Sequence, residues 1–174
     1  LVRLDANGSL DPSFSPSLGT NATVRTIAWQ SDGGVLIGGH FATVPGTNRQ
    51  DIARLQSNGT LDSSFGFNPP GSFYISSIVL QSNGCVLVAG RGNFGVVNGA
   101  SRKNVARLNA DGGLDDAFDP GTSVTDIWQA AEVRSVALQA DAKVFTGGHF
   151  PGSDNVRNCG IVRLEASGSL DASF

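Results

Sequence analysis

Four oxygen-bearing side chains alternate along one short segment near the start of the sequence: Asp5, Asn7, Ser9 and Asp11. Carboxylate, amide and hydroxyl oxygens at every second position are reminiscent of the loops that bind Ca²⁺. The segment recurs three times, but the position of Asp5 becomes Gln56, Asn109 and Glu165. Because the copies do not keep the ligand set, a calcium site is the less favoured interpretation.

The same recurring segment places an aspartate eight residues after an arginine. The four pairs are Arg3 and Asp11, Arg54 and Asp62, Arg107 and Asp115, and Arg163 and Asp171. A turn such as Ser57-Asn58-Gly59, which ends in glycine, would place the arginine and the aspartate opposite each other across a hairpin. Their repetition predicts partly buried, bidentate ion pairs with a structural role, and this is the favoured interpretation.

Two histidines could bind a metal if their repeats approached a common axis. His40 and His149 occupy equivalent positions, but no third histidine or carboxylate cluster recurs with them, which favours a structural role. The sequence also lacks a supported catalytic triad, a phosphate-binding loop and a Cys-x-x-Cys motif. We therefore expect no enzymatic activity, no metal and no cofactor.

The two cysteines and one asparagine are candidates for covalent modification. Cys85 follows a turn and Cys159 lies in a loop, so we expect them at opposite ends of strands, too far apart for a disulfide. Asn21 fits the N-glycosylation pattern in a loop, whereas Asn7 and Asn58 fit it where a turn needs Asn-Gly. Two free thiols and one candidate glycosylation site, Asn21, are predicted.

A binding role would fall on aromatic and arginine side chains in connecting loops. The candidate ligand contacts are Trp128, Tyr74, Arg49 and Arg102, with Phe73 beside them. Trp128 lies in the longest connector between repeats. Trp29, by contrast, is predicted to lie in the core, because its register partner would be Val35.

These residues belong to a unit that repeats about every 50 residues, which indicates a propeller, a solenoid or a similar array. Alternating apolar residues and turn signals predict four strands per unit. The expected strands are residues 24–30, 35–37, 52–56 and 60–65, then 75–81, 86–90, 105–109 and 113–118, then 133–139, 144–148, 161–165 and 169–174. Unit three has Ala142 where the other first turns have glycine, so its turn should be strained or differently shaped.

The motif Arg-Leu-x-x-x-Gly-x-Leu-Asp-x-x-Phe, with Gln-x-Asp-Gly and Gly-Gly-x-Phe, recurs through the chain. In these motifs the sequence resembles the bacterial delta-60 β-propeller repeat, which is found in tandem in large, often secreted or surface proteins. The resemblance covers essentially the whole chain. It implies an all-β propeller-type array of four-stranded antiparallel blades, without enzymatic activity. Residues 89–94 depart from it by two extra residues, so the resemblance does not predict the local geometry there.

Composition narrows the possible partners and the location. The net charge is −3 and only 16% of residues are charged, which argues against nucleic-acid binding. No apolar run approaches the roughly 20 residues that span a bilayer. The 23 glycines and the low charge favour an extracellular or cell-surface protein.

The repeats divide the chain into a half unit, residues 1–14, and three units, residues 15–65, 66–118 and 119–174. Three and a half blades are too few to close a propeller, so we expect an open array that is a segment of a longer chain. Its partners would be other copies or further repeats, stacked into a larger propeller, superhelix or filament. The alternative is an adhesion module that binds a glycan or a surface protein through its loops.

Overall fold

The computed structural model describes residues 1–19, 22–41, 50–67, 73–97, 100–121, 131–149 and 160–174. Within these ranges strands are the only regular secondary structure, which confirms the all-β prediction. They are β1 (Thr23–Trp29), β2 (Val35–His40), β3 (Ile52–Leu55), β4 (Phe73–Leu80), β5 (Val86–Val97), β6 (Ala100–Leu108), β7 (Glu132–Leu138), β8 (Val144–His149) and β9 (Ile161–Leu164). No helix in the described ranges could cross a membrane.

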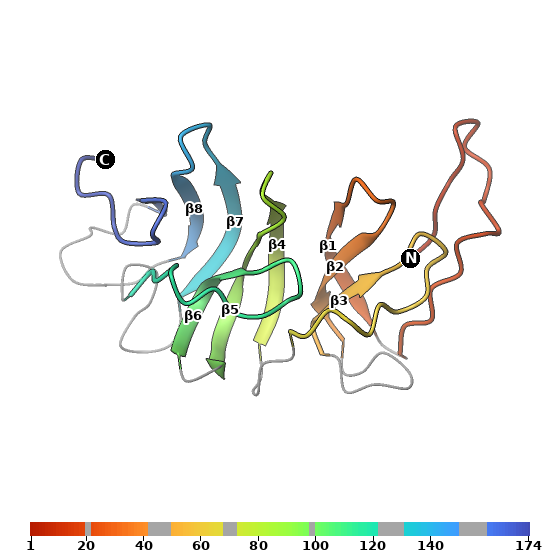
Figure 1. Ribbon diagram of the computed structural model, residues 1–174, viewed down its shortest axis with the longest axis horizontal. Helices are drawn as coiled ribbons and strands as arrows, with labels where there is room; N and C mark the ends of the chain where they lie inside the picture. The colour runs from red at the N-terminus through yellow and green to blue at the C-terminus, as the bar shows by residue number, and fades with distance from the viewer. Residues whose placement is uncertain (20–21, 42–49, 68–72, 98–99, 122–130, 150–159) are drawn as a thin grey trace.

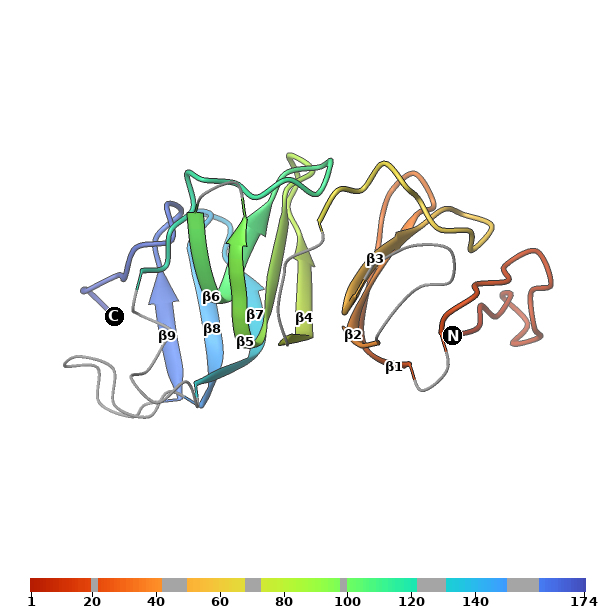
Figure 2. The same ribbon diagram turned by 90° about the horizontal axis from the view of Figure 1, so that it is seen from below.

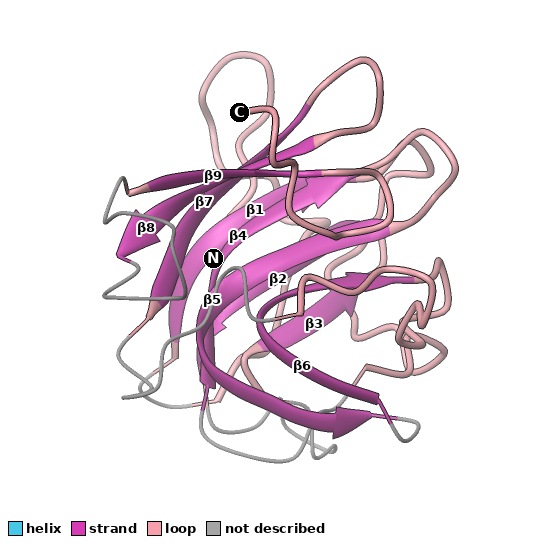
Figure 3. Ribbon diagram, turned by 90° about the vertical axis from the view of Figure 1, so that its left-hand side faces the viewer, coloured by secondary structure: helices cyan, strands magenta, loops and turns pink. Residues whose placement is uncertain are grey.

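Each unit contributes three consecutive antiparallel strands, β1-β2-β3, β4-β5-β6 and β7-β8-β9. The three sheets lie one after another along the long axis, with the two termini at opposite ends (Figures 1 and 2). Seen along that axis, the strands of successive units lie behind one another (Figure 3). The second and third of these three-stranded sheets join where Arg91 of β5 pairs with Glu132 of β7, so their strands form one six-stranded sheet.

The hairpin register follows the turn chemistry, but the predicted fourth strand does not form. Trp29 pairs with Val35, and Leu55 pairs with Leu61, both as expected. Leu61, however, is an isolated bridge, and the same holds in the other units. The cause is the next residue: Asp62 Oδ1 accepts the backbone N–H of Ser64 at 2.9 Å, which turns the chain away after one paired residue. Each described blade is three strands and a bridge.

The two extra residues of unit two extend a hairpin. β5 runs for 12 residues and β6 for 9, both longer than expected, and they pair from Val86 and Leu108 to Val97 and Ala100. The added length is absorbed by register shifts between Ala89 and Asn93 and between Asn93 and Val96.

The alanine in the first turn of unit three keeps the turn shape at the cost of backbone strain. Ala142 has φ +66°, and its N–H donates to Gln139 O at 3.0 Å, as Gly33 N–H donates to Gln30 O at 3.0 Å. A side chain disfavours this left-handed conformation, which glycine adopts freely. Of the two predicted outcomes, strain is the one observed.

The core consists of layers between the sheets. Leu36 and Ile52 of the first sheet pack with Ile75 and Val88 of the second, and a similar layer separates the second and third sheets. A third cluster, around Phe14, covers part of the outer face of the first sheet. The prediction that Trp29 lies in the core is wrong: it is 57% exposed on that outer face, because the residues around Phe14 do not reach it.

Candidate functional site

The arginine of each repeat makes a separate contact with each part of its guanidinium group. Arg54 Nε donates to Asp62 Oδ2 at 2.7 Å and Nη2 donates to Ser64 Oγ at 3.0 Å. Its guanidinium carbon lies 5.0 Å from the centre of the Phe65 ring. Nη1 reaches the next unit and donates to Ala110 O at 2.6 Å. The arginine therefore joins its own hairpin to the turn of the following blade.

The same link occurs three times in the array. Arg3 Nη1 donates to Ser57 O at 2.6 Å, and Arg107 Nη1 donates to Ala166 O at 2.8 Å. Arg163, in the last unit, keeps the ion pair with Asp171 at 2.7 Å. The structure thus brings all four arginine–aspartate pairs together, with side chains between 3% and 25% exposed.

The predicted bidentate geometry is wrong. In each of the four pairs the ion-pair contact to the carboxylate is made by Nε, at 2.7 or 2.8 Å. In Arg54 the two terminal nitrogens are used by Ser64 and by Ala110, so they do not form a fork on the aspartate. The sequence indicates a local pair but not the partner in the next repeat.

Three backbone contacts reinforce these links. The residue after the phenylalanine donates its N–H to the next turn: Ser15 N to Asn58 O at 3.1 Å, Gly66 N to Asp111 O at 2.6 Å, and Asp119 N to Ser167 O at 2.8 Å. The turn glycine lies so close that a Cβ on Gly112 would be 2.8 Å from the nitrogen of Gly66. The turn therefore needs glycine both for its positive φ and for the approach of the preceding unit.

Hydroxyl groups on the first strands tie successive sheets together. Thr26 Oγ1 in β1 accepts the N–H of Ile78 in β4 at 3.2 Å. Ser77 Oγ in β4 accepts the N–H of Val136 in β7, also at 3.2 Å. Ser135 is the equivalent residue of β7. Each link therefore runs from one unit to the next in chain order.

The aspartates that pair with the repeated arginines stay ionised, because their hydrogen bonds lower their pKa values. Partial burial raises the pKa of Asp62, but hydrogen bonds from Ser64 and Arg54 outweigh it and hold the pKa below its usual value. Hydrogen bonds from Lys143, Ser173 and Arg163 likewise hold the pKa of Asp171 far below its usual value. These links are therefore charged at neutral pH.

Several predicted contact residues are occupied within the fold. Arg102 is 6% exposed and its Nε donates to Phe118 O at 2.8 Å, and Phe73 is 3% exposed in the core. The Tyr74 ring lies under the guanidinium of Arg25, 4.4 Å away. Neither Arg102 nor Phe73 is placed to meet a ligand. The remaining candidates lie outside the described residues: Trp128, Arg49, Asn21 and Cys159.

Asp5 and His40, two of the residues considered as metal ligands, contact other groups of the protein. Asp5 Oδ1 accepts the N–H groups of Asn7 and Ser9 at 2.8 and 2.9 Å. His40 Nδ1 lies 3.4 Å from Asp51 Oδ1. No group of three or more His, Cys, Asp or Glu residues in the described ranges could hold a metal ion, and Cys85 is a free thiol.

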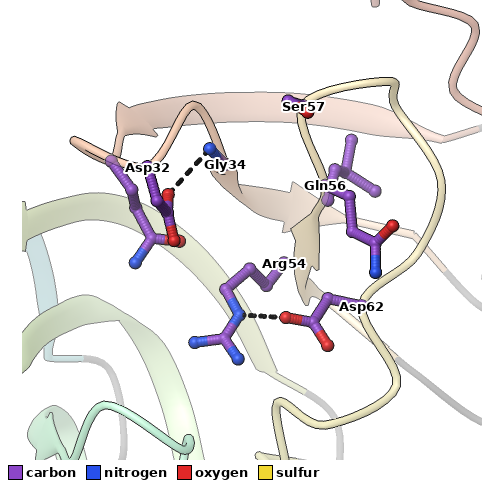
Figure 4. Close-up of a pocket in the computed structure, with 8 residues that line it drawn as sticks. Asp32, Gly34, Arg54, Gln56, Ser57 and Asp62 are labelled. Carbon is purple, nitrogen blue, oxygen red and sulfur yellow. Dashed lines mark hydrogen bonds and ion pairs between the residues drawn. The ribbon is translucent and has the colours of Figure 1, made fainter.

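A polar pocket of about 230 Å³ lies beside the Arg54 link in the first blade (Figure 4). It is lined by Gln30, Asp32, Gly34, Arg54, Leu55, Gln56, Ser57 and Asp62. The position of Gly34 is taken by Lys143 in the third unit, where Nζ contacts Glu165 at 3.0 Å and Asp171 at 2.8 Å. Lys143 was not among the predicted site residues, although a charge that appears in only one copy of a repeat is a visible signal in the sequence.

Each segment that matches a known family model contains one of the four arginine–aspartate pairs. The model describes a domain of unknown function, the DUF5122 β-propeller, and it matches residues 1–14, 30–65, 81–118 and 139–174. The chain belongs to this family. Every matched segment of the DUF5122 β-propeller ends at the phenylalanine that lies under the link arginine. The predicted β-propeller repeat is thereby confirmed.

A solved structure also resembles the chain: the extracellular domain of a one-component system from B. thetaiotaomicron, 14% identical, with a TM-score of 0.47. The similarity covers 80% of this chain but 16% of that one, so the chain spans about a sixth of the length of that structure. No curated protein matches the sequence.

Proposed function

We propose that this DUF5122 β-propeller chain is a non-enzymatic structural module of an extracellular or cell-surface protein of the delta-60 repeat type. It builds a larger propeller, superhelix or filament by stacking one blade on the next. One observation supports this above all: residues that are buried between blades inside the array are exposed at its two ends.

The first end is the outer face of the first blade and the half unit before it. Ile27 is 54% exposed, whereas its equivalents Ile78 and Val136 are 7% and 6% exposed. Leu4 is 55% exposed, and its equivalent Leu55 is 1% exposed. This face has the composition of a blade interface without a blade on it.

The second end is the outer face of the third blade. Phe174 is 59% exposed, whereas the equivalent Phe65 is 1% exposed. Ile161 is 44% exposed, and its equivalent Ile52 is fully buried. The two ends are therefore the two different halves of the interface that the interior forms twice.

Because each end would meet the face that it contacts inside the array, the association we propose is head to tail. Such contacts form a ring if the rotation between copies closes, and an open filament if it does not. The contacts between interior blades indicate which polar contact the proposed interface would contain. Arg163 would donate to the turn of the next blade, as Arg107 donates to Ala166 O. Burial of the exposed side chains contributes about 25 cal/mol per Å² before the costs of association.

Sedimentation velocity on the 174-residue chain tests the proposal. We expect species larger than a monomer that grow with protein concentration. Ile27→Asp with Trp29→Asp blocks one end, and Ile161→Asp with Phe174→Asp blocks the other. Each blocked protein should be a monomer alone, and their mixture should form a dimer through the two intact ends.

Arg134→Asp is the matched control, because Arg134 is 70% exposed on a strand surface. It should leave association unchanged. A concentration-independent monomer for the unmodified chain, or a mixture of blocked proteins that stays monomeric, would contradict head-to-tail stacking.

The absence of enzymatic activity and the external location are parts of the same proposal. The charged groups of the links form ion pairs with one another, which supports a structural role. The composition is rich in glycine and poor in charge, which supports an external location. The alternative function, a module that binds a glycan or a surface protein, is favoured by the polar pocket of the first blade. Binding of the chain to a glycan array, with both ends blocked by the substitutions above, would favour this alternative.

A further inference from the structure

The pocket of the first blade has a counterpart in the third blade that is filled by a lysine of the chain itself. In both blades an arginine donates through Nε to an aspartate at 2.7 Å, Arg54 to Asp62 and Arg163 to Asp171. Lys143 enters the third-blade site from the position that is Gly34 in the first. The repeat thus shows one framework in a filled and an open form.

The filled form shows what the framework accepts. Asp171 Oδ2 receives the ammonium of Lys143 at 2.8 Å and the guanidinium of Arg163 at 2.7 Å. Glu165 Oε1 holds the same ammonium at 3.0 Å. One carboxylate oxygen therefore serves two cations, so the arginine link does not prevent a second positive group from binding there.

The open form presents similar oxygen atoms. Asp62 and Gln56 occupy the positions of Asp171 and Glu165, and Asp32 adds a second carboxylate to the wall. Gln30 Oε1 is buried and has no hydrogen-bond partner. The corresponding oxygens of Gln81 and Gln139 are also buried without a hydrogen-bond partner.

Charge and size restrict the ligand. Two carboxylates and one guanidinium leave the lining with a net negative charge. All three nitrogens of Arg54 already donate to protein oxygens, so they offer little to an anion. At about 230 Å³ the space is smaller than pockets for drug-sized ligands.

We propose that the pocket beside Arg54 binds a primary alkylammonium group, held by Asp62 and Gln56 as Lys143 is held by Asp171 and Glu165. The group is either a small free amine or a lysine side chain of another protein. The exposed end-face residues, such as Ile27 and Phe174, are not part of its lining, although Arg54 and Ser57 also take part in contacts between blades.

The test is an NMR titration of the chain with n-butylammonium, with both ends blocked to keep it monomeric. We expect saturable shifts of the backbone amides of Gly34 and Gln56, and no such shifts with n-butanol, which has the same stem without the charge. Gln56→Glu, which copies Glu165, should tighten binding about threefold to tenfold. Gly34→Lys, which copies Lys143, should weaken it about tenfold or more by filling the pocket.

A second measurement uses the third blade and does not depend on those variants. Lys143→Ala empties the filled site, so it should lower the melting temperature, and n-butylammonium should restore part of the loss while n-butanol does not. No saturable shift at Gly34 and Gln56, or an equal response to n-butanol, would overturn the proposal. A tripeptide that contains lysine and has capped termini separates the two ligand sources. Tighter binding of this peptide than of n-butylammonium would identify a protein side chain as the ligand. Tighter binding of n-butylammonium would identify a free amine.

Discussion

The guanidinium group of Arg54 has four kinds of partner: an aspartate, a serine, a phenylalanine ring and a carbonyl group of the next blade. Each partner uses a different part of a planar group with fixed donor directions. Lysine has a single flexible ammonium and could not satisfy all of them together. The Nε bond to aspartate and the contact with a phenylalanine ring are common to all four arginines.

Replacing Arg54 by alanine should destabilise the chain markedly. The change leaves Asp62 without its cation and Ala110 O without its donor, while the Phe65 ring loses the group above it. We expect a loss of about 2–4 kcal/mol in the free energy of unfolding, measured with urea. Arg134→Ala, which removes a 70% exposed side chain, should cost less than about 1 kcal/mol. Equal effects of the two changes would mean that the link adds nothing to stability.

Asp51 should make stability depend on pH. It is 4% exposed with φ +61°, and Oδ1 accepts Phe41 N–H at 2.8 Å. Burial raises its pKa, although the Phe41 bond and His40 oppose this. A raised pKa means that the folded state disfavours the charged form, so this group lowers stability as pH rises from the unfolded value of about 3.9 through the raised one.

Asp51→Asn should therefore raise the melting temperature at pH 7 by about 1–4 °C, and the gain should disappear at acid pH. Asparagine is already found at the equivalent position, where Asn104 has φ +63° and accepts the N–H of Gly92 at 3.1 Å. Thermal unfolding across a pH series measures the effect. A gain that grows toward acid pH would show that the charged form is favoured after all.

The ion pairs were predictable from the sequence because Arg54 and Asp62 lie in one hairpin, whose turn sets the register. The bond from Arg54 to Ala110 was not, because it joins residues 56 positions apart and depends on how two blades pack. Lys143 was missed for a related reason. Its partners, Glu165 and Asp171, lie on other segments of the blade.

Among the elements, the hairpin turns fix most of the local geometry. A side chain in the turn accepts the N–H two residues later, as Asp32 does from Gly34 at 2.9 Å and Asn83 from Cys85 at 3.0 Å. The next position takes a positive φ, which is +84° for Gly84 and +66° for Ala142. The turns thus have one shape with two different residues at the strained position.

Exchanging these two residues gives a matched pair of tests. Ala142→Gly should stabilise the chain by about 0.5–1 kcal/mol, because glycine relieves the left-handed strain. Gly84→Ala should destabilise the chain by a similar amount, because alanine would have to adopt the positive φ. A Cβ there would lie at an ordinary 3.4 Å from Ala110 Cβ, so no clash would add to this loss. Urea unfolding of both variants measures the exchange. Effects of the same sign would rule out backbone strain as the cause.

Strand positions followed from alternating apolar residues, but strand ends and covered faces did not. Alternation cannot detect that Asp62 accepts Ser64 N–H and ends the pairing after Leu61. Nor can it tell whether an apolar face has a neighbour. Trp29 alternates like a core residue and is nevertheless 57% exposed.

At the scale of the whole molecule, the phenylalanine of each repeat distinguishes interior from end. Phe65 and Phe174 both lie beneath an arginine, at 5.0 and 4.9 Å, but they are 1% and 59% exposed. Phe65→Ala should therefore cost about 3–5 kcal/mol. Phe174→Ala should cost about 1 kcal/mol or less under conditions where the chain is monomeric.

Because each of the two phenylalanines lies under its own arginine, the difference between the two losses in the free energy of unfolding measures burial between blades. Urea unfolding at low protein concentration provides both values. Similar losses at the two positions would mean that the local stack, rather than the neighbouring blade, provides the stability.

The links along the chain join each unit only to its neighbours, so the protein resembles a short row of coupled segments more than a single block. The middle sheet has a neighbour on both faces, whereas the outer face of the first sheet is covered only in part and the outer face of the third sheet has no neighbouring sheet. Local opening should therefore start at the ends and reach the centre last. In hydrogen-exchange experiments, the amides that pair β4 with β5 should exchange most slowly, and those of β9 much sooner. When another blade covers the end next to β9, protection there should rise toward that of the centre.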